Sequence, residues 1–157
     1  MREASIEETT GYLLAKICRA HRANVGGALA DLGLHVGQEM VLLELLKEDG
    51  LKASELAGRL GVEPPTVTRM ISRMQSCGLV ERRRDLADAR SFRVYLMEKG
   101  RALGGPVARC WEEIEEKTLR GMSWEEVQVL RRLLARVREN LACDAGTKTK
   151  NVQRGLS

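Results

Sequence analysis

Hydrophobic residues recur at helical spacing through most of the chain, and the pattern is clearest near its centre. Within residues 65–77 the apolar positions are spaced i, i+3, i+4 and i+7, as Val67, Met70, Ile71 and Met74. This spacing predicts a helix with one buried stripe. The elements predicted around it are a short strand at Leu51, a helix over 53–60, a turn over 61–64, a strand over 79–84, a charged tip over 85–90 and a strand over 92–96.

Helices are also predicted on both sides of this central stretch. They cover residues 7–32, 37–47 and 98–119, and a last helix starts after Ser123. Ser123-Trp124-Glu125-Glu126 has the form of a capping box. The apolar seam of the last helix is Val127, Leu130, Leu134, Val137 and Leu141, at alternating steps of three and four. Gly104-Gly105-Pro106 is expected to loosen the first turns of the helix over 98–119.

Together these elements predict a mainly α protein with a small β-wing. Two helices at a sharp angle followed by a hairpin form a winged helix-turn-helix, and the other helices form a frame. We assign 34–97 to the winged module, 1–33 and 98–142 to a helical dimerisation region, and 143–157 to a C-terminal tail. The frame has more apolar surface than a monomer hides, so we expect a homodimer.

The polar face of the helix over 65–77 has no carboxylate. It consists of Pro65, Thr66, Thr68, Arg69, Ser72, Arg73 and Ser76, opposite the buried stripe. Arginines and hydroxyls hydrogen-bond phosphates and base edges, since Arg suits guanine and the Thr methyl suits thymine. An ordinary solvated face mixes charges of both signs. Double-stranded DNA is therefore the predicted partner.

The predicted hairpin is also rich in arginine. Its arginines are Arg82, Arg83, Arg84, Arg90 and Arg93, against Glu81, Asp85 and Asp88. A basic ribbon beside a basic helix fits insertion of the tip into the minor groove. Arg84, Arg90 and Arg93 are the DNA contacts predicted from the ribbon. Some of these arginines are expected to pair locally. We expect Asp88 to brace the loop while Arg90 reaches out.

Composition changes this picture little until charge is mapped along the chain. The 157 residues form one domain, or one domain with a dimerising frame, and 43% of them are hydrophobic. The net charge is only +4. Residues 63–101 contain nine basic and five acidic side chains, so this segment holds the whole excess.

Other functional classes find no support in the sequence. Cys18, Cys77, Cys110 and Cys143 are far apart, which favours reduced cytosolic thiols over a zinc site or disulfides. No apolar leader begins the chain and no run is long enough to span a membrane, so a cytoplasmic location is expected. No catalytic constellation, metal cluster or cofactor-binding loop is evident, and we expect neither an enzyme nor a cofactor.

Four motifs resemble the MarR family of bacterial and archaeal transcription regulators. They are Gly61 to Arg69, Gly78-Leu79-Val80-Glu81-Arg82, Asp88-Ala89-Arg90-Ser91 and Glu98-Lys99-Gly100. The resemblance implies a homodimer, usually a repressor, that reads a pseudo-palindromic operator. By position it implies helix contacts from Ser54, Pro65, Thr66, Thr68, Arg69 and Arg73, and a wing-tip contact from Arg90. Lys52 and Glu63 stand where the family often has a Ser or Thr helix cap.

Regulators of this family often bind small aromatic or phenolic acids, and the resemblance implies a candidate site for such an effector. Arg19 stands where some relatives hold the carboxylate, and a guanidinium suits that group. A salt bridge is the equal alternative for Arg19. His21 is expected to be a core histidine rather than a second ligand contact.

Two further interpretations are weighed against these. Some relatives sense hydroperoxides through a cysteine near the start of the first helix, but Cys18 lies about two turns too far along. Cys18, Cys77 and Cys110 are expected to be small core residues instead. A winged module used for protein–protein assembly is the other alternative, and the carboxylate-free helix face argues against it.

Overall fold

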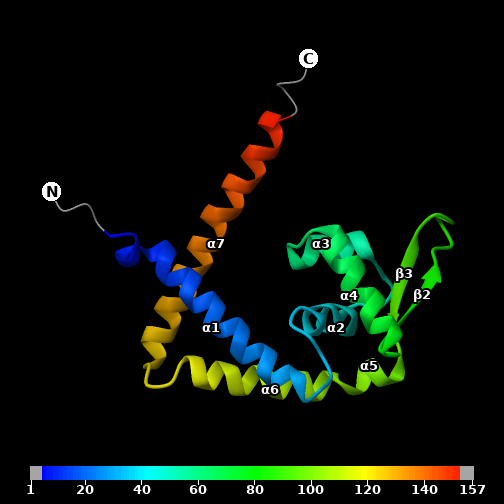
Figure 1. Ribbon diagram of the computed structural model, residues 1–157, viewed down its shortest axis with the longest axis horizontal. Coiled ribbons are helices and arrows are strands. Elements are labelled where there is room, and N and C mark those ends of the chain that lie inside the picture. The colour runs from blue at the N-terminus through cyan, green and yellow to red at the C-terminus, as the bar shows by residue number, and fades with distance from the viewer. Residues whose placement is uncertain (1–4, 153–157) are drawn as a thin grey trace. The chain divides into compact units, whose positions relative to one another are not determined.

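The computed structural model describes residues 5–152, with side chains described up to residue 142. The elements are a 3-10 turn η1 (Ile6–Glu8), α1 (Thr10–Ala30), α2 (Gln38–Lys47), β1 (Leu51–Lys52), α3 (Ala53–Leu60), α4 (Pro64–Ser76), β2 (Val80–Arg84), β3 (Phe92–Leu96), α5 (Glu98–Ala102), α6 (Gly104–Thr118) and α7 (Trp124–Val152) (Figure 1). The chain divides into two compact units between Glu115 and Glu116. The mainly helical fold with a small antiparallel sheet confirms the predicted fold class.

α3, α4 and the β2–β3 hairpin follow one another as the alternating pattern predicts. Gly61 ends α3 with φ of 63° and Gly78 follows α4 with φ of 71°, backbone conformations that glycine adopts without steric cost. The sheet order is β1-β3-β2, all antiparallel, with Leu51 and Arg82 both paired with Val94. α4 leads directly into the hairpin, which completes the winged module.

The core of the first unit is built from one stripe of each helix and the inner face of the sheet. Its fully buried side chains include Leu29, Leu42, Leu45, Leu56, Val67, Ile71, Met74, Val80 and Val94. The predicted stripe of α4 is thus buried, except that Met70 is half-buried. α2 is central, as its apolar sequence predicts.

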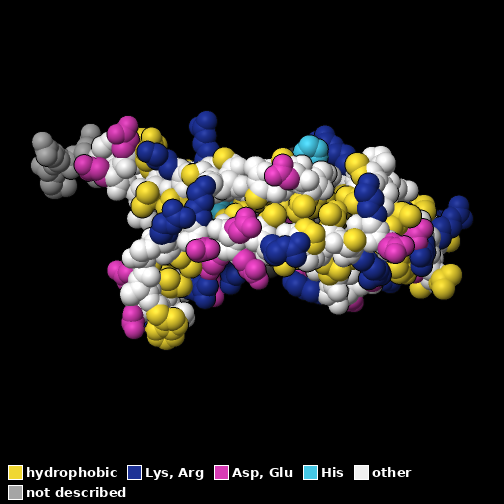
Figure 2. All heavy atoms as spheres, turned by 90° about the horizontal axis from the view of Figure 1, so that it is seen from below, with side chains coloured by type: hydrophobic (Ala, Val, Ile, Leu, Met, Phe, Trp, Pro, Cys, Tyr) yellow, Lys and Arg dark blue, Asp and Glu magenta, His cyan; other side chains and the backbone are white. Residues whose placement is uncertain are grey.

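α1 is shorter than the predicted helix over 7–32, because Thr9 caps it after the 3-10 turn. The Thr9 hydroxyl accepts a hydrogen bond from the Tyr12 backbone N–H at 3.2 Å. Only Val25 and Leu29 of α1 are buried, whereas Leu13 and Ile17 keep 56% and 51% of their surface exposed. The first half of α1 therefore keeps apolar side chains exposed in the single chain. Figure 2 shows hydrophobic side chains at the surface of the molecule, among charged ones.

The predicted helix over 98–119 is divided into α5 and α6 at Leu103, just before the glycine pair. The Ser123 capping box forms, since Glu126 Oε2 accepts the Ser123 N–H at 2.7 Å and Ser123 Oγ accepts the Glu126 N–H at 3.2 Å. α7 continues as helix through Val152, into the segment assigned to a tail. None of the described helices is long and apolar enough to cross a membrane.

Candidate nucleic-acid interface

The exposed face of α4 presents cations and hydroxyls, and the helix itself contains no carboxylate. Thr68, Arg69, Ser72 and Arg73 are exposed and Thr66 is half-buried. Within residues 5–142, neither Arg69 nor Arg73 lies within ion-pair distance of a carboxylate. These two guanidinium groups are thus available to an external anion. Glu63 precedes α4 as its N-cap residue but makes no side-chain cap hydrogen bond.

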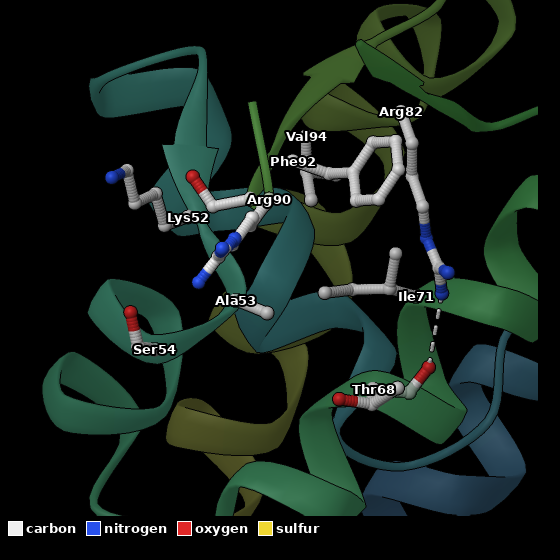
Figure 3. Close-up of a pocket in the computed structure, with 10 residues that line it drawn as sticks. Lys52, Ala53, Ser54, Thr68, Ile71, Arg82, Arg90, Phe92 and Val94 are labelled. Atoms are coloured by element: carbon white, nitrogen blue, oxygen red, sulfur yellow. Dashed lines mark hydrogen bonds between the residues drawn. The ribbon is translucent and has the colours of Figure 1, made fainter. Parts of the chain in front are cut away.

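Arg82 links the hairpin to α4. Its Nη2 donates to Ser72 Oγ at 2.7 Å. The same nitrogen donates to the Thr68 carbonyl oxygen at 3.4 Å, and the dashed line in Figure 3 marks this second contact. The Ser72 hydroxyl in turn donates to the Thr68 carbonyl at 2.9 Å, and Thr68 Oγ1 donates to the Pro64 carbonyl at 3.0 Å. The Thr68 and Ser72 hydroxyls therefore keep lone pairs, but their protons are already engaged within the helix.

Asp85 anchors the base of the wing, defined here as residues 80–96. Its side chain is only 3% exposed and pairs with Arg93 Nε at 2.7 Å and Lys52 Nζ at 3.2 Å. The Ala87 N–H also donates to Asp85 Oδ1 at 2.8 Å. These contacts, the Ala87 N–H foremost and then the Lys52 and Arg93 cations, lower the pKa of Asp85 to about 2.

Arg93 is engaged inside the wing rather than directed outward. Besides Asp85, it donates from Nη1 to the Gly50 carbonyl oxygen at 2.8 Å. It thereby ties β3 to the segment that precedes β1. The Arg93 guanidinium thus braces the wing, and these bonds would have to be shared or broken for the DNA contact that the sequence predicts.

Arg84 and Arg90 are exposed cations of the wing. Asp88 braces the tip as expected, because its Oδ1 accepts the Arg90 N–H at 3.0 Å and its carbonyl accepts the Ser91 N–H at 2.9 Å. Leu86 at the tip is fully exposed. The tip therefore carries its arginine on a loop with defined hydrogen bonds.

A cavity of about 270 Å³ joins three elements that carry sequence-predicted residues. Ser54 from α3, Thr68 from α4 and Arg90 from the wing all line it, with Lys52 and Phe92 beside them (Figure 3). Figure 3 shows the Arg90 side chain extending across this hollow toward the side where Lys52 and Ser54 lie. The structure thus brings three of the predicted contacts, Ser54, Thr68 and Arg90, to one cavity.

A second cavity, of about 250 Å³, lies where α1 and the α1–α2 loop meet α4. Arg22, His35, Thr66, Arg69 and Arg73 line it. The lining includes neither Arg19, which is exposed, nor His21, whose ring centroid lies 5.8 Å from that of Trp111. Arg19 and His21 do not meet around either cavity.

Sequence reasoning missed several residues of this surface. The wing anchor needs Lys52 and Asp85, the helix link needs Arg82, and the second cavity adds Arg22 and His35. Asp85 occupies a run of charged residues, so nothing local marks it as buried. One sequence signal indicates this anchor, because Lys52 stands directly before the first helix of the winged module.

The expectation that the cysteines are core residues is wrong for two of them. Cys18 and Cys77 are exposed, and Cys110 is half-buried, with its thiol 3.5 Å from the Ala28 carbonyl oxygen. Cys18 lies in the first half of α1, where no residue is buried. The side chain of Cys143 lies outside the described residues.

The helix pair, the braced hairpin and the three-stranded sheet define a winged helix-turn-helix protein. Comparison with known proteins agrees, because the sequence profile of the MarR family matches residues 34–92. Residues 34–92 therefore form a MarR-family module, as the resemblance of the motifs implied.

Individual relatives support this assignment. The transcriptional regulator TtmR of Methylorubrum extorquens is 34% identical over 129 residues, which are 82% of this chain and 63% of that protein. The chain therefore spans less than two thirds of that relative. The transcriptional repressor Rv2887 of Mycobacterium tuberculosis is 26% identical over 81% of this chain and 91% of its own length.

A solved structure of a relative extends the comparison to a complex. A single-residue mutant of MarR from E. coli, complexed with operator DNA, superposes with a TM-score of 0.76 at 25% identity. The match covers 81% of this chain and 91% of that chain. These relatives are regulators, and none of their names describes an enzyme.

Proposed function

We propose that this protein is a sequence-specific, double-stranded DNA-binding transcription regulator. The observation that carries the proposal is the face of α4, where Arg69 and Arg73 are exposed with no carboxylate in ion-pair range among the described residues. Guanidinium groups without an acidic partner on a helix surface suit the phosphates and guanine edges of the major groove. The operator complex of a relative supports the same use of the fold.

In this proposal α4 enters the major groove and the wing enters the minor groove. The helix contacts come from Ser54, Pro65, Thr66, Thr68, Arg69, Ser72 and Arg73, and the wing contacts come from Arg84 and Arg90. Arg93 takes a bracing role, since its guanidinium is held by Asp85 and Gly50. Arg90 is favoured at the tip because narrow minor grooves attract Arg electrostatically.

Selection of bound sites from random DNA, followed by mobility-shift titration, tests the proposal. Arg69→Ala should weaken binding and relax specificity, whereas Arg90→Ala should weaken it. Arg109→Ala, which changes an exposed arginine on α6, is the matched control and should bind as wild type. Binding by wild type that does not fall with rising salt, or equal loss in all three variants, would overturn the proposal.

The proposed assembly is a homodimer that reads a pseudo-palindromic operator. Leu13 and Ile17 of α1 and Trp124, Leu133 and Leu141 of α7 keep between 48% and 72% of their surface exposed in the single chain. A second copy would cover such faces, and two-fold symmetry would set two α4 helices one DNA turn apart, about 34 Å. Light scattering after size exclusion should give twice the chain mass, and a stable monomer at micromolar concentration would contradict this.

We further propose that the regulator is a repressor whose DNA binding a small aromatic or phenolic acid relieves. The relative Rv2887 is named a repressor, which supports the sign of regulation. Arg19 is exposed on α1, and the ring of His21, two residues further along the helix, lies against Trp111. Calorimetry with salicylate on wild type and Arg19→Ala tests the effector. Binding to wild type alone supports it, and no binding to either protein removes it.

A further inference from the structure

The cavity between α1, the α1–α2 loop and α4 has a strongly cationic lining. Arg22, Arg69 and Arg73 bring three guanidinium groups to it, and His35 and Thr66 add polar groups. No carboxylate lines it. With a volume of about 250 Å³, it is large enough for one phosphate group and its bound water. Guanidinium groups bind phosphate oxygens through charge-assisted hydrogen bonds.

A hydrogen bond and close packing shape the wall of this cavity. Gln38 is 4% exposed, and its Oε1 accepts the His35 N–H at 2.9 Å, which holds the α1–α2 loop. Gly37 has φ of 100°, and a Cβ there would come within 2.6 Å of Met70 Cε. The loop therefore packs closely against α4, and His35 is set beside the exposed arginines of that helix.

Glu39 is an acidic neighbour of Arg22, and it does not line the cavity. Glu39 is buried, and its Oε2 accepts the Gly37 N–H at 2.6 Å. Burial raises the pKa of Glu39, and the charge of Arg22 counters part of that rise. Arg22 forms no ion pair within 4.0 Å in the described part of the chain, so its charge remains available to an anion.

We propose that this cavity is a phosphate site, in which Arg22 and His35 hold a DNA backbone phosphate beside the major groove that α4 enters. The inference rests on the proposed function, and it adds two residues from outside the winged module's helices to the DNA-binding surface. Because Arg69 and Arg73 share the cavity with Arg22, a phosphate seated there lies next to the bases that α4 reaches. Such a contact fixes the register of the protein on the duplex without reading sequence.

The test compares the salt dependence of DNA binding for wild type, Arg22→Gln, His35→Gln and the control Arg109→Gln on one selected duplex. The loss of one cationic phosphate contact, as in Arg22→Gln, should reduce the slope of log K against log salt by about 0.9. His35→Gln removes only a hydrogen bond, so it should weaken binding without that change of slope. Between about 50 and 200 mM salt, Arg22→Gln should therefore lose about 3-fold less affinity than wild type does. The same change is expected on unrelated DNA, and Arg109→Gln should keep the wild-type slope. Circular dichroism melts confirm that the variants fold.

A second arm locates the phosphate. Methylphosphonate groups, which are neutral, replace single phosphates of the duplex in turn. One replacement should weaken wild type and leave Arg22→Gln unaffected. Two results together would overturn the phosphate site: Arg22→Gln keeps the wild-type salt slope, and no methylphosphonate position distinguishes it from wild type. The proposed function would still stand in that case if Arg69→Ala weakens DNA binding.

Inorganic pyrophosphate distinguishes a free anion from the DNA backbone. Calorimetry that shows pyrophosphate binding to wild type and not to Arg22→Gln, together with an unchanged salt slope, would assign the cavity to a free phosphate compound and overturn the DNA contact. Competition between pyrophosphate and the duplex for wild type, but not for Arg22→Gln, would support the DNA contact. Absence of any DNA binding by wild type would overturn the proposed function and this inference together.

Discussion

Replacing Gly100 with alanine should destabilise the protein and weaken its DNA binding. Gly100 is buried in α5. A Cβ on Gly100 would overlap the carbonyl oxygen of Leu79 and lie 3.2 Å from its carbonyl carbon and 3.1 Å from Leu96 Cδ2. Two of these three atoms belong to the backbone, so the overlap cannot be relieved by turning a side chain.

The Leu79 carbonyl is also fixed in place, since it accepts the Met97 N–H at 3.0 Å. Overpacking of this kind costs about 1–3 kcal/mol and occasionally more. Alanine regains about 1 kcal/mol over glycine through its higher helix propensity. With the obstruction in the backbone, we place the steric cost at the upper end and expect a net loss of about 2 kcal/mol.

Gly105→Ala is the matched control. Gly105 lies in the first turn of the adjacent helix α6, where a Cβ would meet only Arg109 Nη1, at 3.6 Å. It should therefore stabilise the protein by up to about 1 kcal/mol. Urea denaturation measures both changes, and mobility shift measures DNA binding. Because Leu79 connects α4 to β2, Gly100→Ala should also weaken binding. Equal stability of the two variants would refute the steric reasoning.

Charged groups lead to three further predictions. Arg93→Ala should lower the urea midpoint of unfolding, because Asp85 loses one ion-pair partner and the Gly50 carbonyl loses this donor. Arg90 is exposed, so Arg90→Ala should leave that midpoint unchanged and weaken DNA binding several-fold. The pKa of Asp85 is lowered from 3.8 to about 2, so the stability that its charge contributes is complete above pH 3.8 and lost as the pH falls toward 2. Asp85→Asn should therefore be less stable than wild type near neutral pH, and this difference in stability should shrink in acid. Burial raises the pKa of Glu39 above its ordinary 4.5, so wild type should lose stability relative to Glu39→Gln as the pH rises past that value, and urea titrations that show no pH-dependent difference would contradict this.

Local sequence signals predicted the winged module closely. The bounds of α3 and β3 agree with the predicted 53–60 and 92–96, because periodic apolar residues and glycine stops both act within a few residues. Gly61 and Gly78 have the positive φ angles that such stops require. The exposed polar residues of α4 followed from the same periodicity.

Contacts between distant segments were beyond this reasoning. Arg93 donates to Gly50, 43 residues away, and Asp85 pairs with Lys52, so neither partner is visible in local patterns. The division between α5 and α6 lies beside Gly104, where a Cβ would come within 2.9 Å of Leu46 Cδ1. That close approach of α2 to α6 depends on tertiary packing, as does the exposure of Cys18.

The hydrogen bond from Arg82 to Ser72 has a consequence for any partner of this surface. It joins β2 to α4, so the distance between helix and hairpin is set by the fold itself. Both elements then meet a partner as one unit, and the partner must fit the spacing between them. In the proposed complex, a DNA duplex whose two grooves do not match that interval is disfavoured by its shape, independently of any base contact.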